Sequence, residues 1–221
     1  MIFAAGFGTR MRPLTNERPK PLIEVGNTTL LDHAIDLTRG AGIGRIVVNT
    51  HYFSDMIRTH LDGQNILISD ETGSILETGG GLKAALPLLQ SDAVFTINSD
   101  AVWKGPNPFD VLKEAWDSSR MGALLLVVPP DAALGHAGSG DFDLGPDGQI
   151  SRGTETIYSG AQIIRADKVQ DIEEDAFSLN RVWNQFAETA ELFGVVYPGR
   201  WCDVGRPECI PLAETLLTDD V

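Results

Sequence analysis

The sequence predicts an α/β fold: a doubly wound, mostly parallel sheet with a small mixed β extension. Its 221 residues, 43% of them hydrophobic, are enough to bury the core of one domain. Short apolar runs at 46–48 and 94–97 are typical of parallel strands that are covered on both faces. Strand and helix patterns alternate up to about residue 130, which indicates helical connections between the strands of one sheet.

The elements are expected from apolar runs and from apolar residues at helical spacing. The first strand is short, with three apolar residues before Ala4. The first helix carries Leu30, Leu31, Ala34 and Ile35 on one face. We expect strands at 1–4, 45–50, 65–69, 93–98, 122–129, 156–165 and 192–197, and helices at 29–41, 54–62, 80–89, 108–119, 178–190 and 206–217.

The pattern changes after residue 130. Residues 131–155 are rich in Gly, Asp and Ala, and Pro146-Asp147-Gly148 has the composition of a hairpin turn. We expect this segment to form the mixed, partly antiparallel extension and one wall of a cleft. Ligands of open α/β sheets bind outside the carboxyl ends of the strands, so the cleft should lie at that edge. No repeat or linker divides the sequence, which favours a single domain.

The charge and the composition limit the partners. A formal net charge of −14 makes nucleic acid and anionic membranes unexpected partners. No apolar run is long enough to cross a bilayer and no secretory signal precedes the first strand, so we expect a cytoplasmic protein. Cys202 and Cys209 lack metal-binding spacing and are expected to be reduced. The first twenty residues are locally positive, with Arg10, Arg12, Arg18 and Lys20 against the acid Glu17.

A glycine turn directly after the first strand is the most informative feature for function. Gly6 and Gly8 let the backbone turn tightly and bring its N–H groups close to a ligand. Arg10 and Lys20 add positive charge at the same place. The segment lacks the GxxxxGK[ST] pattern of a P-loop and the third glycine of a dinucleotide fingerprint. We therefore expect an oligophosphate ligand.

Three further motifs follow predicted strands. The segment 77–81, ETGGG, precedes an apolar helix, and its glycines would let a base or ribose lie against exposed N–H groups. Asp100 follows the strand at 93–98, and Asp203 lies in the segment 201–205, WCDVG. A buried carboxylate is costly unless it is paired or metal-bound, and two of them suit Mg²⁺. Taken singly, each residue also suits an ordinary loop, turn or helix cap.

Residues 4–22, AAGFGTRMRPLTNERPKPL, resemble the signature loop of the sugar-1-phosphate nucleotidyltransferases, and the resemblance covers nearly the whole chain. It implies a Rossmann-like, GT-A-type sheet in one domain over 1–221. The nucleotide-binding half would span about 1–130 and the sugar-binding half about 131–221, without the C-terminal β-helix of bifunctional relatives. In this family a sugar-1-phosphate oxygen attacks the α-phosphorus of a nucleoside triphosphate, and pyrophosphate leaves. Charge along this in-line path must be neutralised.

The resemblance also implies roles for individual residues. Arg10 would stabilise the transferring phosphate and the pyrophosphate, and Lys20 would reach the α-phosphate or the sugar phosphate. Asp100 and Asp203 would hold Mg²⁺. Nucleotide contacts are implied for Ala5, Gly6, Gly8, Thr9, Glu77, Gly79 and Gly80.

Segments 138–142 (GSGDF), 158–160 (YSG) and 76–81 (LETGGG) look most like the N-acetylmuramate-1-phosphate uridylyltransferase subfamily. This likeness implies sugar contacts from Asp141, Ser159 and Gly160, and UTP and N-acetylmuramate-1-phosphate as substrates. Mannose-1-phosphate guanylyltransferases share the same loops and are the alternative. A non-catalytic nucleotide-sugar sensor on the same fold is the alternative from another class, but the presence of all four charged site residues favours an enzyme.

The sequence departs from the family pattern at three points. Ser99 stands where glycine is usual, which is compatible with a negative φ, and Arg206 replaces a threonine. Many members carry a Glu-Lys-Pro segment whose lysine holds the sugar phosphate, and this triplet is absent. Its charge could come from Arg152, Lys168 or Arg200, or Lys20 and the metal could suffice.

Overall fold

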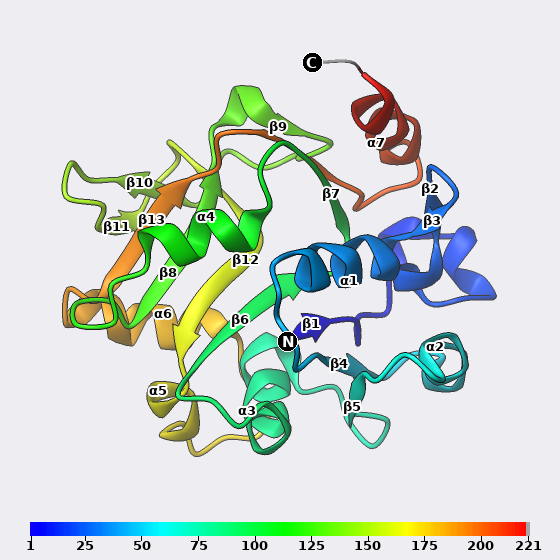
Figure 1. Ribbon diagram of the computed structural model, residues 1–221, viewed down its shortest axis with the longest axis horizontal. Coiled ribbons are helices and arrows are strands. Elements are labelled where there is room, and N and C mark those ends of the chain that lie inside the picture. The colour runs from blue at the N-terminus through cyan, green and yellow to red at the C-terminus, as the bar shows by residue number, and fades with distance from the viewer. Residues whose placement is uncertain (220–221) are drawn as a thin grey trace.

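Seven strands form the central sheet of the computed structural model, which describes residues 1–219 (Figure 1). Six pairs of neighbouring strands make up this sheet. Four of the pairs are parallel, and the two that include the strand at 157–165 are antiparallel. The sheet is therefore mostly parallel, and all seven predicted strands are present. Their order is β13 (Leu192–Val196), β8 (Ala123–Val128), β12 (Ile157–Arg165), β6 (Ala93–Asn98), β1 (Ile2–Phe3), β4 (Val47–Thr50) and β5 (Leu67–Asp70).

Helices cover both faces of this sheet, as a doubly wound fold requires (Figure 1). One buried cluster joins the sheet to α1 (Leu30–Gly40), α2 (Ser54–Leu61) and α4 (Pro108–Ala115). The cluster on the opposite face joins it to α3 (Glu77–Leu89), α5 (Asp167–Gln170) and α6 (Leu179–Glu188). A third cluster packs α7 (Cys209–Thr218) against the first loop. The six predicted helices are present, and α5 was not predicted.

Smaller sheets surround the carboxyl edge of the main sheet. The predicted hairpin consists of β10 (Phe142–Leu144) and β11 (Ile150–Arg152). A mixed sheet has β14 (Arg200–Asp203) at its centre. β14 pairs antiparallel with β7 (Ala101–Lys104) and parallel with β9 (Ala133–Leu134). Further short elements are β2 (Glu24–Val25), β3 (Thr28–Thr29) and 3₁₀ turns at Thr9–Met11, Leu14–Asn16, Lys20–Leu22 and Pro130–Ala132.

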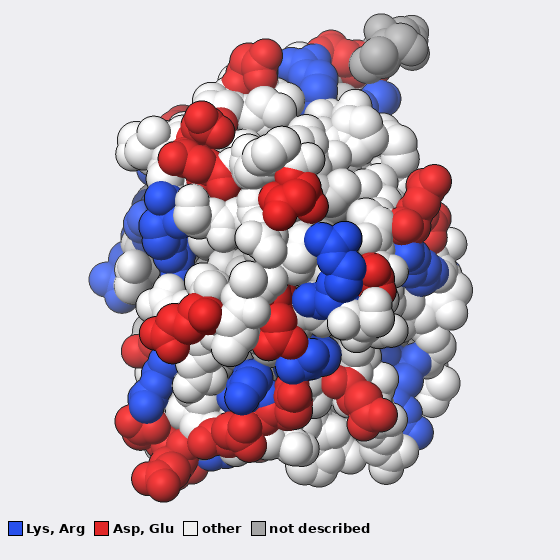
Figure 2. All heavy atoms as spheres, turned by 90° about the vertical axis from the view of Figure 1, so that its left-hand side faces the viewer, with Lys and Arg blue, Asp and Glu red and all other residues white. Residues whose placement is uncertain are grey.

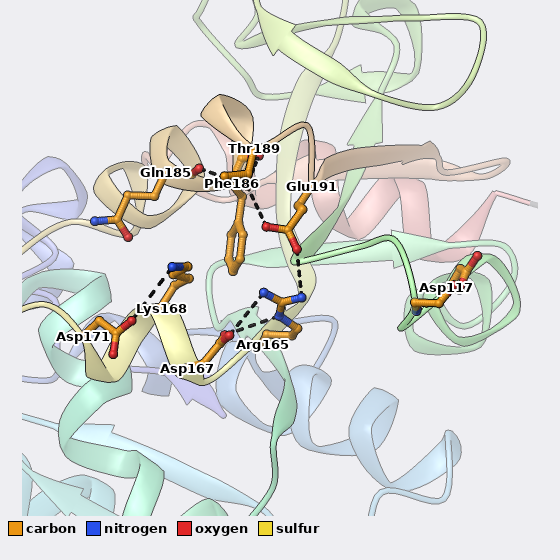
Figure 3. A network of polar contacts seen from close by, with 10 residues as sticks. Asp117, Arg165, Asp167, Lys168, Asp171, Gln185, Phe186, Thr189 and Glu191 are labelled. Carbon is orange, nitrogen blue, oxygen red and sulfur yellow. Dashed lines mark hydrogen bonds and ion pairs between the residues drawn. The ribbon is translucent and has the colours of Figure 1, made fainter.

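The strand β12 belongs to the predicted sugar-binding half, about 131–221, but it lies between β8 and β6, which belong to the predicted nucleotide-binding half, about 1–130. Its end is fixed by Arg165, whose Nη1 lies 2.9 Å from Glu191 Oε1 and whose Nη2 lies 3.2 Å from Asp167 Oδ2 (Figure 3). The same guanidinium lies 5.4 Å from the centre of the Phe186 ring. These contacts join β12 to α5, α6 and the start of β13. Because β12 is antiparallel to β6, this anchor lies at the edge of the sheet opposite the carboxyl end of β6.

The surface reflects the acidic composition. Figure 2 shows basic and acidic side chains interspersed over the face that carries the β10–β11 hairpin. None of the helices within residues 1–219 combines the length and hydropathy needed to span a lipid bilayer. Both cysteines are reduced and buried, as predicted.

Candidate active site

The loop after β1 turns sharply at Gly8, which has a φ of +61°. A Cβ at Gly8 would lie 2.9 Å from both Lys20 Cβ and Thr15 Cγ2, so this position requires glycine for space as well as for conformation. The Thr15 hydroxyl donates to the Gly8 carbonyl at 2.8 Å and ties the two ends of the loop together. At Gly6, by contrast, a Cβ would meet no atom within 4 Å. Its surroundings are open because it faces a cavity.

Hydrogen bonds fix the start of this loop and leave its tip free. The Ala4 N–H donates to Asn49 Oδ1 at 2.7 Å, and Asn49 Nδ2 donates to the buried Glu71 Oε1 at 2.7 Å. Within residues 1–219, the N–H groups of Gly6 and Gly8, and of the residue between them, have no acceptor. Consecutive unpaired N–H groups form an anion-binding concavity. The loop therefore has free N–H groups that an anion could accept from, and its binding of phosphate stays a prediction.

A cavity of about 430 Å³ opens over this loop at the carboxyl edge of β1, β4 and β6. We call it the first cavity. Among its lining residues, Asn98 and Asn49 come from strand ends, and Ile75 precedes α3. Eight of the predicted site residues line it: Ala5, Gly6, Gly8, Thr9, Arg10, Lys20, Glu77 and Asp100.

Two carboxylates lie near each other beside the first cavity, of which Asp100 is a lining residue and Asp203 is not. Asp100 follows β6, and Lys20 Nζ donates to its Oδ2 at 2.9 Å. Antiparallel pairing of β7 and β14 places Asp203 opposite Ala101, and the Val204 N–H donates to the Asp100 carbonyl at 2.8 Å. Burial and the negative charge of Asp100 raise the pKa of Asp203, whereas the nearby cations lower it. The fold therefore holds two carboxylates together against their mutual repulsion.

This arrangement fits a magnesium ion. No cluster of three or more His, Cys, Asp and Glu side chains that could hold a metal occurs within residues 1–219. Mg²⁺ commonly takes one or two carboxylates and completes its shell with water and phosphate oxygens, which is the donor set that Asp100 and Asp203 offer beside the loop. Ser99 is compatible with this site because its φ is not positive, and its hydroxyl donates to the Phe3 carbonyl at 2.6 Å.

The glycine-rich segment has a different local structure from the one predicted. Helix α3 begins at Glu77, three residues earlier than expected, and Glu77 has a φ of +59° while it lines the first cavity. The N–H groups of Gly79 and Gly80 both donate to the Phe177 carbonyl, at 2.8 and 3.0 Å. A Cβ on either glycine would overlap the segment 175–177. These two glycines allow close packing of α3 there, and neither lines the cavity or offers an exposed N–H.

A second cavity of about 260 Å³ adjoins the first, and both are lined by Phe3, Thr78 and Asn98. Asp141 lines the second cavity, and its Oδ2 accepts the Tyr158 N–H at 2.9 Å. The other lining residues are Phe142, Arg152, Tyr158, Ser178, Leu179, Asn180 and Trp183.

The remaining residues predicted for the sugar lie inside the sheet. The buried Ser159 hydroxyl donates to the Leu126 carbonyl at 2.6 Å. Gly160 lies at a bulge in β12 with a φ of +89°, where a Cβ would be 2.8 Å from Asn98 Nδ2. Neither lines the first or the second cavity. The structure gives them a supporting position behind Asn98, because β12 is a buried central strand.

Two of the three candidates for the missing sugar-phosphate cation lie elsewhere. The Lys168 side chain lies 4.0 Å from that of Asp171, and the Arg200 side chain lies 3.9 Å from that of Asp219; neither basic residue lines the first or the second cavity. Arg152 lines the second cavity. Sequence reasoning missed Asn49 and Asn98, although polar residues at the ends of apolar strands were a usable signal. It also missed Glu71, Tyr158 and Trp183, whose position depends on tertiary packing.

Comparisons with known proteins agree with this geometry. Residues 1–138 match the MobA-like NTP transferase domain family. The chain is 37% identical to the N-acetylmuramate alpha-1-phosphate uridylyltransferase of Caulobacter vibrioides, over 99% of this chain and 96% of the relative. It is 31% identical to the protein of the same name from Neisseria meningitidis, over 93% and 92%. A mannose-1-phosphate guanyltransferase from Yarrowia lipolytica is 28% identical, over 94% of this chain and 61% of the relative.

Solved structures share the fold. HddC from Yersinia pseudotuberculosis, complexed with GMP-PN, superposes with a TM-score of 0.79 at 22% identity over 98% of both chains. A putative glucose-1-phosphate thymidylyltransferase from Bacillus anthracis gives a TM-score of 0.81 at 16% identity, over 100% of this chain and 95% of the other. From the family match and these similarities, we conclude that the chain belongs to the MobA-like NTP transferase domain family and is a nucleotidyltransferase.

Proposed function

We propose that the protein transfers the uridylyl group of UTP to N-acetylmuramate α-1-phosphate with Mg²⁺ as cofactor, giving UDP-N-acetylmuramate and pyrophosphate. The observation that carries the reaction class is the first cavity, where unpaired N–H groups adjoin Arg10, Lys20 and two carboxylates. The choice of substrates is supported by the two uridylyltransferase relatives, which match along nearly their whole length.

The reaction needs charge stabilisation more than proton transfer. An oxygen of the sugar phosphate, already anionic at neutral pH, attacks the α-phosphorus of UTP. The bond from that phosphorus to the α,β-bridging oxygen breaks, and pyrophosphate leaves with the electron pair. The unpaired N–H groups around Gly6 bind the triphosphate, Arg10 stabilises the charge that develops on pyrophosphate, and Lys20 moves from Asp100 toward the α-phosphate.

Asp100 and Asp203 would hold the magnesium ion, which neutralises phosphate charge when bound. Glu77 would face the nucleoside from the wall of the first cavity. Gly79 and Gly80 would contribute to this subsite by letting α3 pack closely against residues 175–177. The acceptor sugar would extend from the first cavity into the second, where Asp141 is available and Ser159 and Gly160 support the wall.

A panel of nucleoside triphosphates and sugar 1-phosphates, scored by pyrophosphate release, tests this proposal. The largest kcat/KM should belong to UTP with N-acetylmuramate α-1-phosphate, and omission of Mg²⁺ should abolish release. A clear preference for GTP with mannose 1-phosphate would establish the alternative that the guanyltransferase relatives suggest. Absence of release with every pair, despite nucleotide binding measured by calorimetry, would instead indicate a non-catalytic sensor.

A further inference from the structure

Arg152 is the one basic residue among those that line the second cavity. It lies at the end of β11, and its guanidinium carbon is 4.7 Å from the centre of the Phe142 ring and 5.8 Å from that of Trp183. Its Nη2 donates to the side-chain oxygens of Asn180 at 2.6 Å and Asn184 at 3.1 Å. Two aromatic rings and two neutral amides therefore fix the orientation of this cation.

The charge of Arg152 is not neutralised by an ion pair. Within residues 1–219 no carboxylate oxygen lies within 4.0 Å of its guanidinium, whereas Arg58 and Arg181 each have one carboxylate partner and Arg165 has two. Burial lowers the pKa of Arg152, and the charge of the nearby Asp141 opposes that lowering, but Asp141 Oδ2 already accepts the Tyr158 N–H. A preoriented guanidinium beside a cavity, held by neutral partners, suits an anionic ligand group.

The position of Arg152 excludes the reacting phosphates as that group. The triphosphate site, Lys20 and Asp100 belong to the first cavity, which Arg152 does not line. The two cavities meet at Phe3, Thr78 and Asn98, so an acceptor whose phosphate lies in the first cavity extends its sugar ring past them. Arg152 then faces substituents of the ring remote from the anomeric phosphate.

From this placement we infer that Arg152 binds a carboxylate carried by the acceptor sugar and so selects acidic sugar 1-phosphates. The inference rests on the proposed function and deepens it, because N-acetylmuramate differs from N-acetylglucosamine by a lactyl ether that ends in a carboxylate. Arg152 is thus a specificity-determining residue, separate from the groups that bind the reacting phosphates.

Steady-state kinetics of Arg152→Gln with three acceptors test this inference. The acceptors are N-acetylmuramate α-1-phosphate, its lactyl methyl ester and N-acetylglucosamine α-1-phosphate. For the acid, KM should rise by about 10- to 100-fold in the variant, the factor expected for loss of a charge-assisted hydrogen bond. For the two acceptors that lack the carboxylate, kcat/KM should not change, which also shows that the variant is folded. Arg152→Lys should recover part of the preference.

Arg181→Gln is the matched control, because it removes the same charge from α6 outside both cavities. It should retain the preference of the original protein for the acid. If Arg152→Gln retained it as well, or if it weakened all three acceptors equally, the inference would be wrong while the proposed function stood. If the unmodified protein used the acceptors without a carboxylate as efficiently as the acid, its selection of acidic acceptors would be refuted. If it transferred to none of the three, the proposed acceptor itself would be refuted.

Discussion

The two glycines of the loop after β1, Gly6 and Gly8, should respond in opposite ways to substitution by alanine. Gly8→Ala places a Cβ against Lys20 and Thr15 in a left-handed conformation, whereas Gly6→Ala adds a methyl group in open space. The first change should damage the fold. The second should leave the fold intact and damage nucleotide binding.

The magnitudes follow from the structure. For Gly8→Ala, the left-handed backbone costs about 1 kcal/mol and the two contacts at 2.9 Å add about 1–3 kcal/mol, a total of about 2–4 kcal/mol. In a chain of this size, that lowers Tm by about 5–15 °C. For Gly6→Ala, the unfolding free energy should change by less than about 0.5 kcal/mol. Its methyl group would separate the loop from a phosphate, and loss of one charge-assisted hydrogen bond lowers kcat/KM for UTP by about 10- to 100-fold.

Urea denaturation and pyrophosphate-release kinetics on both variants test this reasoning. Gly44→Ala is the control, because Gly44 also has open space and no positive φ but lies outside both cavities. It should change neither stability nor kcat/KM. If Gly6→Ala kept full kcat/KM for UTP, close approach of a phosphate to this loop would be refuted. A Gly8→Ala protein as stable as its parent would refute the steric argument.

Three further perturbations separate the roles of charged and buried groups. Arg10→Ala should lower kcat by about 10²–10³-fold. Arg12→Ala is the control and should leave kcat unchanged, because Arg12 does not line the first cavity. If both variants lowered kcat equally, a general positive charge near the loop, and not Arg10 itself, would be what the reaction needs. Asp203→Asn should raise the Mg²⁺ concentration for half-maximal rate by about tenfold or more, because one of two anionic ligands is lost; an unchanged Mg²⁺ titration would remove Asp203 from the metal site. Burial raises the pKa of Tyr197 to about 12 from 10.0, so its contribution to stability is complete below pH 10 and is lost as the pH rises toward 12. Urea titrations at several pH values should therefore show a smaller fall in unfolding free energy between pH 10 and pH 12 for Tyr197→Phe than for the original protein. If the unfolding free energies of the two proteins fell in parallel, the raised pKa of Tyr197 would be contradicted.

The main sheet and the sharp glycine turn after β1 were predictable because their signals are local. An apolar run identifies a parallel strand wherever it occurs, and Gly8 and Lys20 lie within one short segment. The paired carboxylates were predictable through the family resemblance, since Asp100 and Asp203 are far apart in the sequence. The structure adds the pairing of β7 with β14, which brings them together and which neither segment indicates alone.

The second cavity could not be predicted in the same way. Its residues come from strands and helices spread over the chain, from β1, α3 and β6 to the β10–β11 hairpin, β12 and α6, so their proximity depends on how these elements pack. Trp183 is a buried core residue that also lines the cavity. Gly79 and Gly80 show the opposite case. Glycine was read as access for a ligand, whereas in the structure it permits close approach of residues 175–177, a contact far away in the sequence.

The insertion of β12 between β8 and β6 has a consequence for dissection of the protein. A fragment such as 1–138 would contain the loop after β1 but would lack β12, the strand that joins β8 to β6. It would expose two rows of unpaired backbone groups on apolar strands, and such edges recruit other chains. Expressed alone, this fragment should aggregate instead of binding nucleotide. During synthesis, β8 and β6 can be joined only after β12 has been completed at Arg165.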